Sequence, residues 1–139
     1  MDPANNMLSI QNLHIYKGDA LLLELDTTVS AGEILTIMGP SGSGKSTLLS
    51  WLSGMLEPVF SAEGKLELDG YDITQTASHH RQIALLFQDP LLFNHLSVSG
   101  NIEFGMQHSK SNTRKQRVSE ALASVGLSGM ETRAPKSLS

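Results

Sequence analysis

The sequence contains no cysteine, and aromatic residues make up only 5% of its 139 residues. The absence of cysteine excludes disulfides and thiolate metal ligands, and it is compatible with a reducing compartment. Basic residues are also few: the sequence has 10 Lys and Arg and 14 Asp and Glu, so its net charge is −4. The composition therefore does not indicate a basic surface of the kind that binds nucleic acid or anionic lipid.

Long hydrophobic runs are missing as well. No apolar run approaches the roughly 18 residues that a membrane-spanning helix needs, and the longest candidate, 46–56 (STLLSWLSGML), is broken by polar residues. The first residues, MDPANNMLSIQ, lack the basic start and apolar core of a secretory signal. The histidines are not spaced as metal ligands, because the adjacent His79 and His80 would point roughly 100° apart on a helix.

The hydrophobic pattern predicts several strands. Two segments rich in Leu and Ile, 8–16 and 20–29, flank the turn residues Lys17-Gly18-Asp19 and predict an N-terminal β-hairpin. Short apolar runs at 33–38 and 82–87 are typical of buried strands. Residues 65–68 alternate and predict a further strand, which ends at the tight-turn pair Asp69-Gly70.

Helical spacing occurs in three segments. These are residues 45–55, 98–106 and 113–125. Thr113 and Gln116 stand at the spacing of a capping box for the last helix. Because the pattern changes from strand-like to helical after Pro90, we divide the chain into residues 1–92, with a β subdomain, and residues 93–139, the beginning of a helical subdomain.

The motif that carries chemistry is GPSGSGKST at residues 39–47, which satisfies G-x-x-x-x-G-K-[ST]. Glycines let successive backbone N–H groups point into one concavity, where the oxygens of a polyphosphate can lie. The helix predicted from Lys45 adds the positive end of its dipole. Lys45 would reach the β- and γ-phosphates, and the Ser46 hydroxyl would coordinate Mg²⁺. The candidate binding residues are Gly39, Ser41, Gly42, Ser43, Gly44, Lys45, Ser46 and Thr47.

From residue 8 to residue 139 the sequence resembles the nucleotide-binding subunit of ATP-binding-cassette (ABC) transporters, of the importer type whose membrane subunits are separate chains. Besides the P-loop, three features carry this resemblance. Tyr16, at the tip of the predicted hairpin, matches the aromatic residue that stacks on adenine. The segment LLFQDPLLFNHLSV is similar to the Q-loop, and Gln88 matches the glutamine that contacts Mg²⁺ and the attacking water. The final PKSLS is similar to the approach to the signature LSGGQ, with Leu138 and Ser139 as its first residues.

The resemblance implies an α/β fold: a RecA-like P-loop core with an N-terminal antiparallel β subdomain and the start of an α-helical subdomain. In that fold the strand before the P-loop lies within a mainly parallel sheet. The implied ligands are ATP and Mg²⁺, and Lys45 and Gln88 are the implied catalytic residues. The implied partners are transmembrane permease subunits and a second nucleotide-binding subunit, without nucleic acid, at the cytoplasmic face of the membrane. Phe93, just after the Q-loop, is expected to contact a coupling helix of the membrane subunit.

The sequence stops inside the resembled signature motif. The Walker B aspartate, the catalytic glutamate and the switch histidine of the family would follow this point, so we expect the 139 residues alone to bind nucleotide weakly and to turn over negligibly. Two alternatives remain open. One is a non-catalytic remnant. The other is a nucleoside or nucleotide kinase, because GPSGSGKST also resembles the phosphate-binding loop of such kinases. Two predicted strands, with Tyr16 in the first, precede the P-loop, and no segment resembles the phosphoryl-acceptor lid of a kinase. Both observations favour the ABC ATPase.

Overall fold

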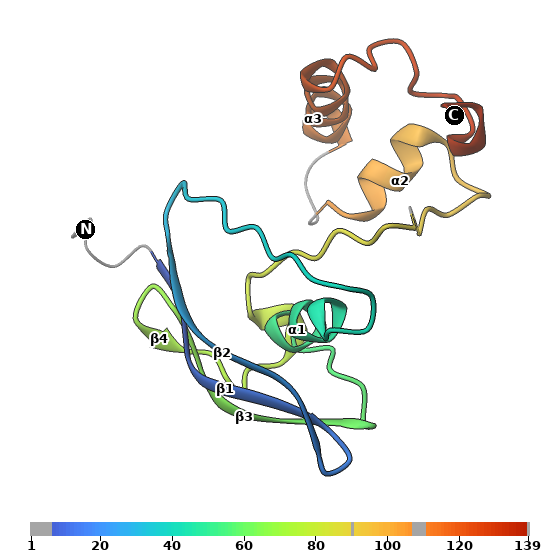
Figure 1. The fold of residues 1–139 in the computed structure, drawn as a ribbon. Coiled ribbons are helices and arrows are strands. Elements are labelled where there is room, and N and C mark those ends of the chain that lie inside the picture. The colour runs from blue at the N-terminus through green and yellow to red at the C-terminus, as the bar shows by residue number, and fades with distance from the viewer. Residues whose placement is uncertain (1–6, 90, 107–110, 139) are drawn as a thin grey trace. The chain divides into compact units, whose positions relative to one another are not determined.

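The structure is a computed structural model that describes residues 7–89, 91–106 and 111–138. Its contacts divide the chain into two compact units, Met1–Leu86 and Phe87–Ser139. The first unit carries an antiparallel sheet with helix α1, and the second carries helices α2 and α3 (Figure 1).

The sheet of the first unit has four strands in the order β2-β1-β3-β4. The strands are β1 (Met7–Lys17), β2 (Ala20–Ser30), β3 (Phe60–Leu68) and β4 (Tyr71–Asp72). β1 pairs antiparallel with both β2 and β3, so the predicted N-terminal hairpin is confirmed. β3 includes the predicted strand at 65–68 but begins earlier, and the turn to β4 uses Asp69 and Gly70, whose φ angles are 54° and 80°. Left-handed backbone at both positions is the geometry that an Asp-Gly pair favours in a two-residue hairpin loop.

A β-bulge at Asn12 keeps the apolar residues of β1 on one face of the sheet. Asn12 has a φ of 47°, and the pairing of β1 with β2 shifts between Ile10 and Leu13. A strand alternates its faces with period two, so without the extra residue Ile10 and Leu13 would point to opposite faces. Gly64 of β3 lies against the bulge, where a Cβ atom would stand 2.7 Å from the Leu13 Cα. A glycine is therefore required at this crossing.

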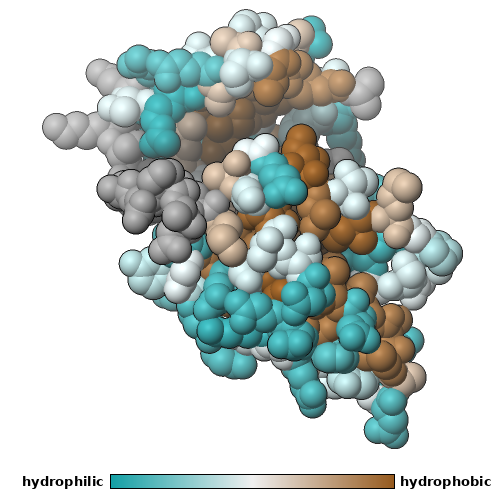
Figure 2. Space-filling view, turned by 60° about the vertical axis from the view of Figure 1, so that its left-hand side comes forward, coloured by the Kyte–Doolittle hydropathy of each residue, from teal (hydrophilic) through white to brown (hydrophobic). Residues whose placement is uncertain are grey.

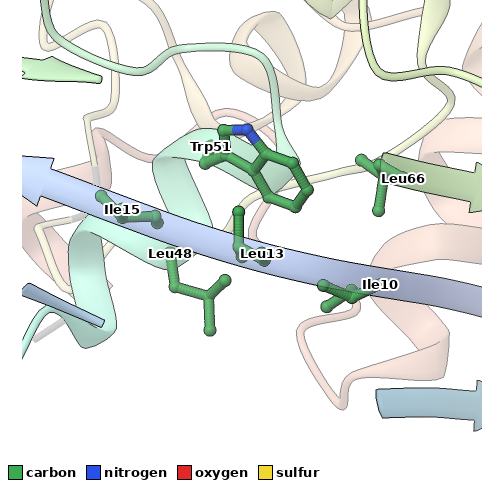
Figure 3. Packing of buried hydrophobic residues seen from close by; sticks show 6 residues of the cluster. All are labelled: Ile10, Leu13, Ile15, Leu48, Trp51 and Leu66. Carbon is green, nitrogen blue, oxygen red and sulfur yellow. The ribbon is translucent and has the colours of Figure 1, made fainter. Parts of the chain in front are cut away.

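Helix α1 (Lys45–Leu52) packs its apolar residues on the face that the bulge makes continuous. Leu48 and Trp51 belong to one buried cluster with residues of β1 and β3 (Figure 3). The sheet side of this cluster consists of Ile10, Leu13, Ile15 and Leu66. Complete burial of an aliphatic or aromatic side chain contributes roughly 1.5–3 kcal/mol, which makes this contact the main apolar stabilisation of the first unit.

The buried Arg81 holds the C-terminal end of α1. Its guanidinium donates hydrogen bonds to the carbonyl oxygens of Trp51 (2.7 Å) and Leu52 (3.1 Å), the last two of the helix. The Trp51 carbonyl also accepts one from the Gly54 N–H at 3.0 Å. It also donates to the carbonyls of Thr74 and Thr76, at 2.7 Å each. Burial lowers the pKa of Arg81 from its ordinary value. The cation thus joins the helix end to the segment that follows β4, and it complements the negative end of the helix dipole.

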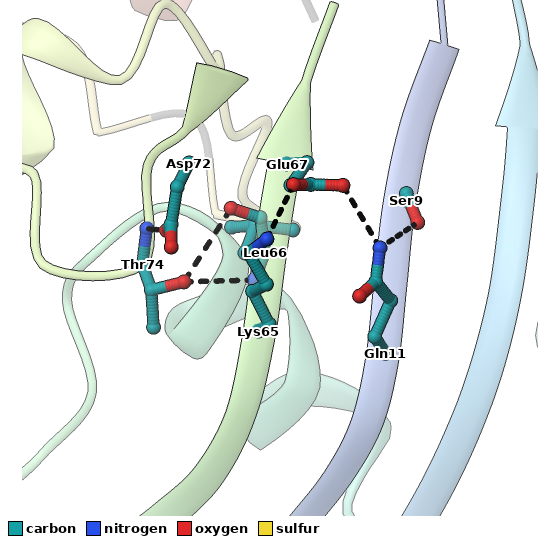
Figure 4. Close-up of polar contacts among 7 residues, drawn as sticks. All are labelled: Ser9, Gln11, Lys65, Leu66, Glu67, Asp72 and Thr74. Carbon is teal, nitrogen blue, oxygen red and sulfur yellow. Dashed lines mark hydrogen bonds and ion pairs between the residues drawn. The ribbon is translucent and has the colours of Figure 1, made fainter. Parts of the chain in front are cut away.

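A second polar network lies across β1, β3 and β4 (Figure 4). The Gln11 amide donates to Ser9 Oγ and to the Glu67 carboxylate, at 3.1 and 2.8 Å. After β4, the Asp72 carboxylate accepts a hydrogen bond from the Thr74 N–H at 2.9 Å, and the Thr74 hydroxyl accepts one from the Leu66 N–H at 2.8 Å. The hydrogen bonds from Thr74 lower the pKa of Asp72 from its ordinary value.

Two predicted strands are wrong: neither 33–38 nor 82–87 has strand pairing among the described residues. Their apolar side chains are largely exposed, with fractions of 89% for Ile34, 86% for Met38 and 95% for Leu86. In the space-filling view, hydrophobic residues reach the surface beside hydrophilic ones (Figure 2). A buried strand needs hydrogen-bonded neighbours, and the part of the chain that the structure describes offers none to these segments. The described sheet is accordingly antiparallel, without the mainly parallel sheet that the resemblance implied.

The helix boundaries also differ from the predictions; the helix predicted at 98–106, for example, ends at Phe104. The helix predicted at 45–55 ends at Leu52, because Gly54 turns the chain away with a φ of 75°. The capping box is wrong, because α3 (Ser111–Ser124) begins before Thr113 and the Gln116 amide donates to Glu120 at 2.8 Å instead of reaching back.

The second unit is helical, as predicted. Its helices are α2 (Val98–Phe104), α3 and the short 3₁₀ helix η3 (Pro135–Leu138). Ser97 caps α2 by accepting a hydrogen bond from the Gly100 N–H at 3.1 Å. Val98, Val118 and Leu122 form its small buried core.

We predict that Arg81→Lys lowers the free energy of unfolding by about 2–3 kcal/mol, because one ammonium cannot replace four hydrogen bonds to buried and part-buried carbonyls. Urea denaturation followed by circular dichroism would measure the change. The same substitution at Arg117, which is exposed on α3, is the matched control and should leave the midpoint unchanged. An Arg81→Lys midpoint equal to that of the parent chain would contradict this assignment.

The Asp72 hydrogen bonds predict a pH dependence of stability. Because the folded-state pKa of Asp72 is lowered, its stabilisation is present above the unfolded pKa of about 3.9 and is lost as the pH falls through the folded value. Asp72→Asn should therefore lower the urea midpoint at pH 7 and have no effect near pH 2. Asp19→Asn, in the exposed hairpin turn, is the control. An equal loss at both pH values would refute a contribution from the charge.

Candidate functional site

The P-loop connects the end of the 33–38 segment to α1. Gly42 and Gly44 have φ angles of 82° and 87°, in the left-handed region, while Ser43 between them does not. Such alternation makes successive N–H groups converge on one point, as in backbone nests that bind anions. Gly44 is the N-cap of α1, and its carbonyl accepts the first helical hydrogen bond, from the Leu48 N–H at 2.8 Å. The loop therefore delivers its N–H groups and the positive helix end to the same place.

Lys45 lies folded over the loop. Its ammonium donates to the carbonyl oxygens of Gly39 and Pro40, at 2.7 Å each, and more weakly to Ser43 Oγ at 3.4 Å. A Cβ atom at Gly39 would stand 2.9 Å from Ser43 Oγ, so that hydroxyl would have to shift. The Ser46 hydroxyl is exposed and has no hydrogen-bond partner among the described residues. A cation and a free hydroxyl thus lie one residue apart at the start of the helix.

A pocket of about 540 Å³ opens over this loop. Its volume falls in the range of small-molecule sites. The residues that line it are Lys17, Leu22, Ser41, Gly42, Gly44, Lys45, Ser46, Thr47 and Phe60. The lining contains two lysines and no carboxylate, so the pocket is positive although the whole chain carries a net charge of −4. The converging N–H groups, the two ammonium groups and the Ser46 hydroxyl fit the phosphates and Mg²⁺ of a nucleotide.

The remaining predicted site residues lie elsewhere. Tyr16 is half-buried near the end of β1, and its ring stacks against His14 with centroids 6.5 Å apart. Gln88 is exposed and belongs to the second unit. Neither residue lines the pocket, so their roles stay predictions.

Two features of the second unit relate to the resemblance. Phe93 is 40% exposed, and its ring packs on Phe104 with centroids 4.6 Å apart. Its contact with a membrane subunit stays a prediction. Of the two signature residues, Leu138 lies in η3, and Ser139 lies outside the described residues.

Three lining residues were missed by sequence reasoning: Lys17, Leu22 and Phe60. They lie on β1, β2 and β3, far from the loop in sequence. No short-range motif marks them. Lys17 lies in the predicted hairpin turn, Leu22 lies in the second predicted strand, and Phe60 lies outside the predicted strands, so the sequence does not indicate that they face one pocket.

The comparison with protein-family models identifies residues 22–139 as an ABC transporter domain. The chain belongs to the ABC transporter family. The family accounts for the P-loop, and the nucleotide-kinase alternative is therefore set aside.

Two curated relatives illustrate the similarity. The thiamine import ATP-binding protein ThiQ of Jannaschia sp. (strain CCS1) is 42% identical over 135 residues, which are 96% of this chain and 57% of that protein. The uncharacterized ABC transporter ATP-binding protein YnjD of Escherichia coli (strain K12) is 41% identical over 135 residues, 96% of this chain and 62% of that protein. The chain thus spans about three fifths of the length of these relatives.

A solved structure supports the same fold. The structure titled as the dimeric form of MJ0796, a bacterial ABC transporter cassette, matches with a TM-score of 0.74 at 26% identity. The match covers 95% of this chain and 63% of that cassette. The mixed α/β fold with an antiparallel β subdomain is therefore that of an ABC cassette in part. None of the helices that the structure describes has the length and hydrophobicity for a membrane span.

The loop glycines allow a matched prediction. Ala at Gly42 meets no atom within 4 Å and has only the left-handed backbone to oppose it, whereas at Gly44 a Cβ would also stand 3.1 Å from Leu22 Cγ. We expect Gly42→Ala to cost about 1 kcal/mol of unfolding free energy and Gly44→Ala about 2 kcal/mol. Urea denaturation of both variants checks this order. Equal costs would mean that the contact with Leu22 relaxes freely.

Proposed function

We propose that the chain binds ATP with Mg²⁺ in the P-loop pocket, as the ATP-binding part of an ABC importer. The observation that carries the proposal is the pocket itself, lined by the loop from Ser41 to Thr47 and by two lysines without a carboxylate. ATP brings several negative charges, which the loop N–H groups, the helix end and the ammonium groups compensate together.

The proposed roles follow the chemistry of each group. On binding, the Lys45 ammonium exchanges the carbonyls of Gly39 and Pro40 for the β- and γ-phosphate oxygens. The Ser46 hydroxyl, which is free of internal partners among the described residues, supplies an oxygen to Mg²⁺. We further propose, from the family resemblance, that Tyr16 stacks on adenine and that Gln88 contacts the metal and the attacking water.

The same resemblance suggests the partners. We propose that residues 1–92 form the nucleotide-binding core and 93–139 the start of a helical subdomain that docks on separate permease subunits through a surface including Phe93. The relatives named for the import of thiamine and of Fe³⁺ share the ATP-binding role but not the solute, so the proposal concerns the ATP-binding role alone. A second nucleotide-binding subunit and a location at the cytoplasmic face of the membrane belong to this proposal.

We propose that these 139 residues supply only part of a catalytic apparatus. A P-loop ATPase needs an acidic residue that shares the Mg²⁺ with the loop hydroxyl and a residue that positions the water. The pocket lining contains no carboxylate that could share the metal. We therefore propose nucleotide binding without turnover for this chain by itself.

The test is a calorimetric titration of the 139-residue chain with MgATP, together with a phosphate-release assay. Lys45→Ala should weaken binding roughly 10- to 100-fold, the equivalent of a lost charged hydrogen bond. Lys65→Ala, on β3 outside the pocket lining, is the matched control and should bind as the parent chain does. Phosphate release should stay at background. Turnover that disappears in Lys45→Ala would refute binding without catalysis, and unchanged affinity in Lys45→Ala would refute the site.

A further inference from the structure

The P-loop pocket has a second wall, built from the sheet. Lys17 ends β1 and Phe60 begins β3, and the two residues are paired directly across the antiparallel ladder. Side chains of directly opposed residues lie on the same face, close enough to touch. Leu22 of β2 completes this wall.

The alternation of β1 decides which residues can face the loop. Pairing with β3 runs without a shift from His14 to Lys17, so Ile15 and Lys17 share one face and Tyr16 takes the other. Ile15 is buried in the cluster that includes Leu48 of α1, and Phe60 packs against the same cluster. The wall of Lys17 and Phe60 therefore lies on the helix side of the sheet.

The two lysines of the pocket are in different situations. The Lys45 ammonium already donates to three oxygen atoms of its own loop. The Lys17 side chain is exposed, and its ammonium has no ion pair or hydrogen bond within the described part of the chain. Beside it stands the half-buried Phe60 side chain. An ammonium group without a partner, next to an aromatic ring, can bind a ligand that carries an anionic group beside an aromatic ring.

We propose that Lys17 and Phe60 hold the nucleoside end of the nucleotide: the Lys17 ammonium contacts the phosphate nearest the ribose, and the Phe60 ring packs against the base. This inference rests on the proposed function. Lys45 and Ser46 take the terminal phosphates and the metal, so the nucleoside leaves the loop toward the opposite wall of the same pocket. Phe60 is then an alternative to Tyr16 as the base contact, on the opposite face of the sheet.

The two contacts predict different ligand dependences, which a titration can separate. The full 139-residue chain is titrated with MgATP and, separately, with magnesium tripolyphosphate, which has the charge but no base. Phe60→Leu keeps an apolar side chain in the core and removes the ring; it should weaken ATP binding roughly tenfold and leave tripolyphosphate binding unchanged. Lys17→Ala should weaken both ligands about three- to fivefold.

Matched controls keep the test sharp. Phe104→Leu and Lys65→Ala repeat the same chemical changes outside the pocket lining and should alter neither ligand. Phe60→Tyr retains a ring and should retain the parent preference for ATP over tripolyphosphate. This variant also keeps the proposal testable should Phe60→Leu fail to fold, which its thermal midpoint would reveal.

The outcomes distinguish this inference from the proposed function. If Lys45→Ala loses both ligands while Phe60→Leu and Lys17→Ala behave as the controls do, the inference is overturned and the ATP site stands. If Tyr16→Leu loses the preference for ATP and Phe60→Leu keeps it, the base contact assigned to Phe60 is overturned. If Lys45→Ala binds both ligands as the parent chain does, the proposed function itself fails.

Discussion

The packing of α1 on the sheet is the contact on which the rest of the first unit depends. A helix of 8 residues does not persist alone in water, so its existence relies on the burial of Leu48 and Trp51 against β1 and β3. The P-loop ends in the N-cap of this helix, and Lys45 and Ser46 are its first residues. The apolar contact therefore determines where the phosphate-binding groups lie, although none of the buried residues touches the pocket.

Two features support that contact: a β-bulge in β1 and a buried arginine at the end of α1. The bulge at Asn12 changes the phase of β1, so that Ile10 and Leu13 both face the helix, and Gly64 leaves room for it. At the other end of α1, Arg81 donates hydrogen bonds to the last two helical carbonyls, those of Trp51 and Leu52. The bulge lets the β1 side chains face the helix, and Arg81 hydrogen-bonds the carbonyls at the helix end. Apolar packing alone provides neither. A buried carbonyl without a partner would cost about as much free energy as the packing of one side chain contributes.

The site combines a local part with a non-local part. The loop from Gly39 to Thr47 carries its phosphate-binding geometry in consecutive residues, and its positive charge is reinforced by the helix dipole. The opposite wall is contributed by three strands that only the sheet register brings together. In the proposed complex, the loop accepts the polyphosphate through its backbone, and the strand residues contact the rest of the ligand.

The sequence by itself determined the hairpin, the P-loop, the start of α1 and the helical character of the second unit, because each depends on residues that are neighbours in the chain. The P-loop could be identified since its glycines, Lys45 and Ser46 act within a single turn of backbone. Only the tertiary structure decided the phase of β1, the partners of Arg81 and the approach of Lys17 and Phe60 to the loop. It also decided that 33–38 and 82–87 remain unpaired among the described residues. Strand pairing and pocket walls join residues distant in sequence, and an apolar run states a preference for burial without naming the neighbour that provides it.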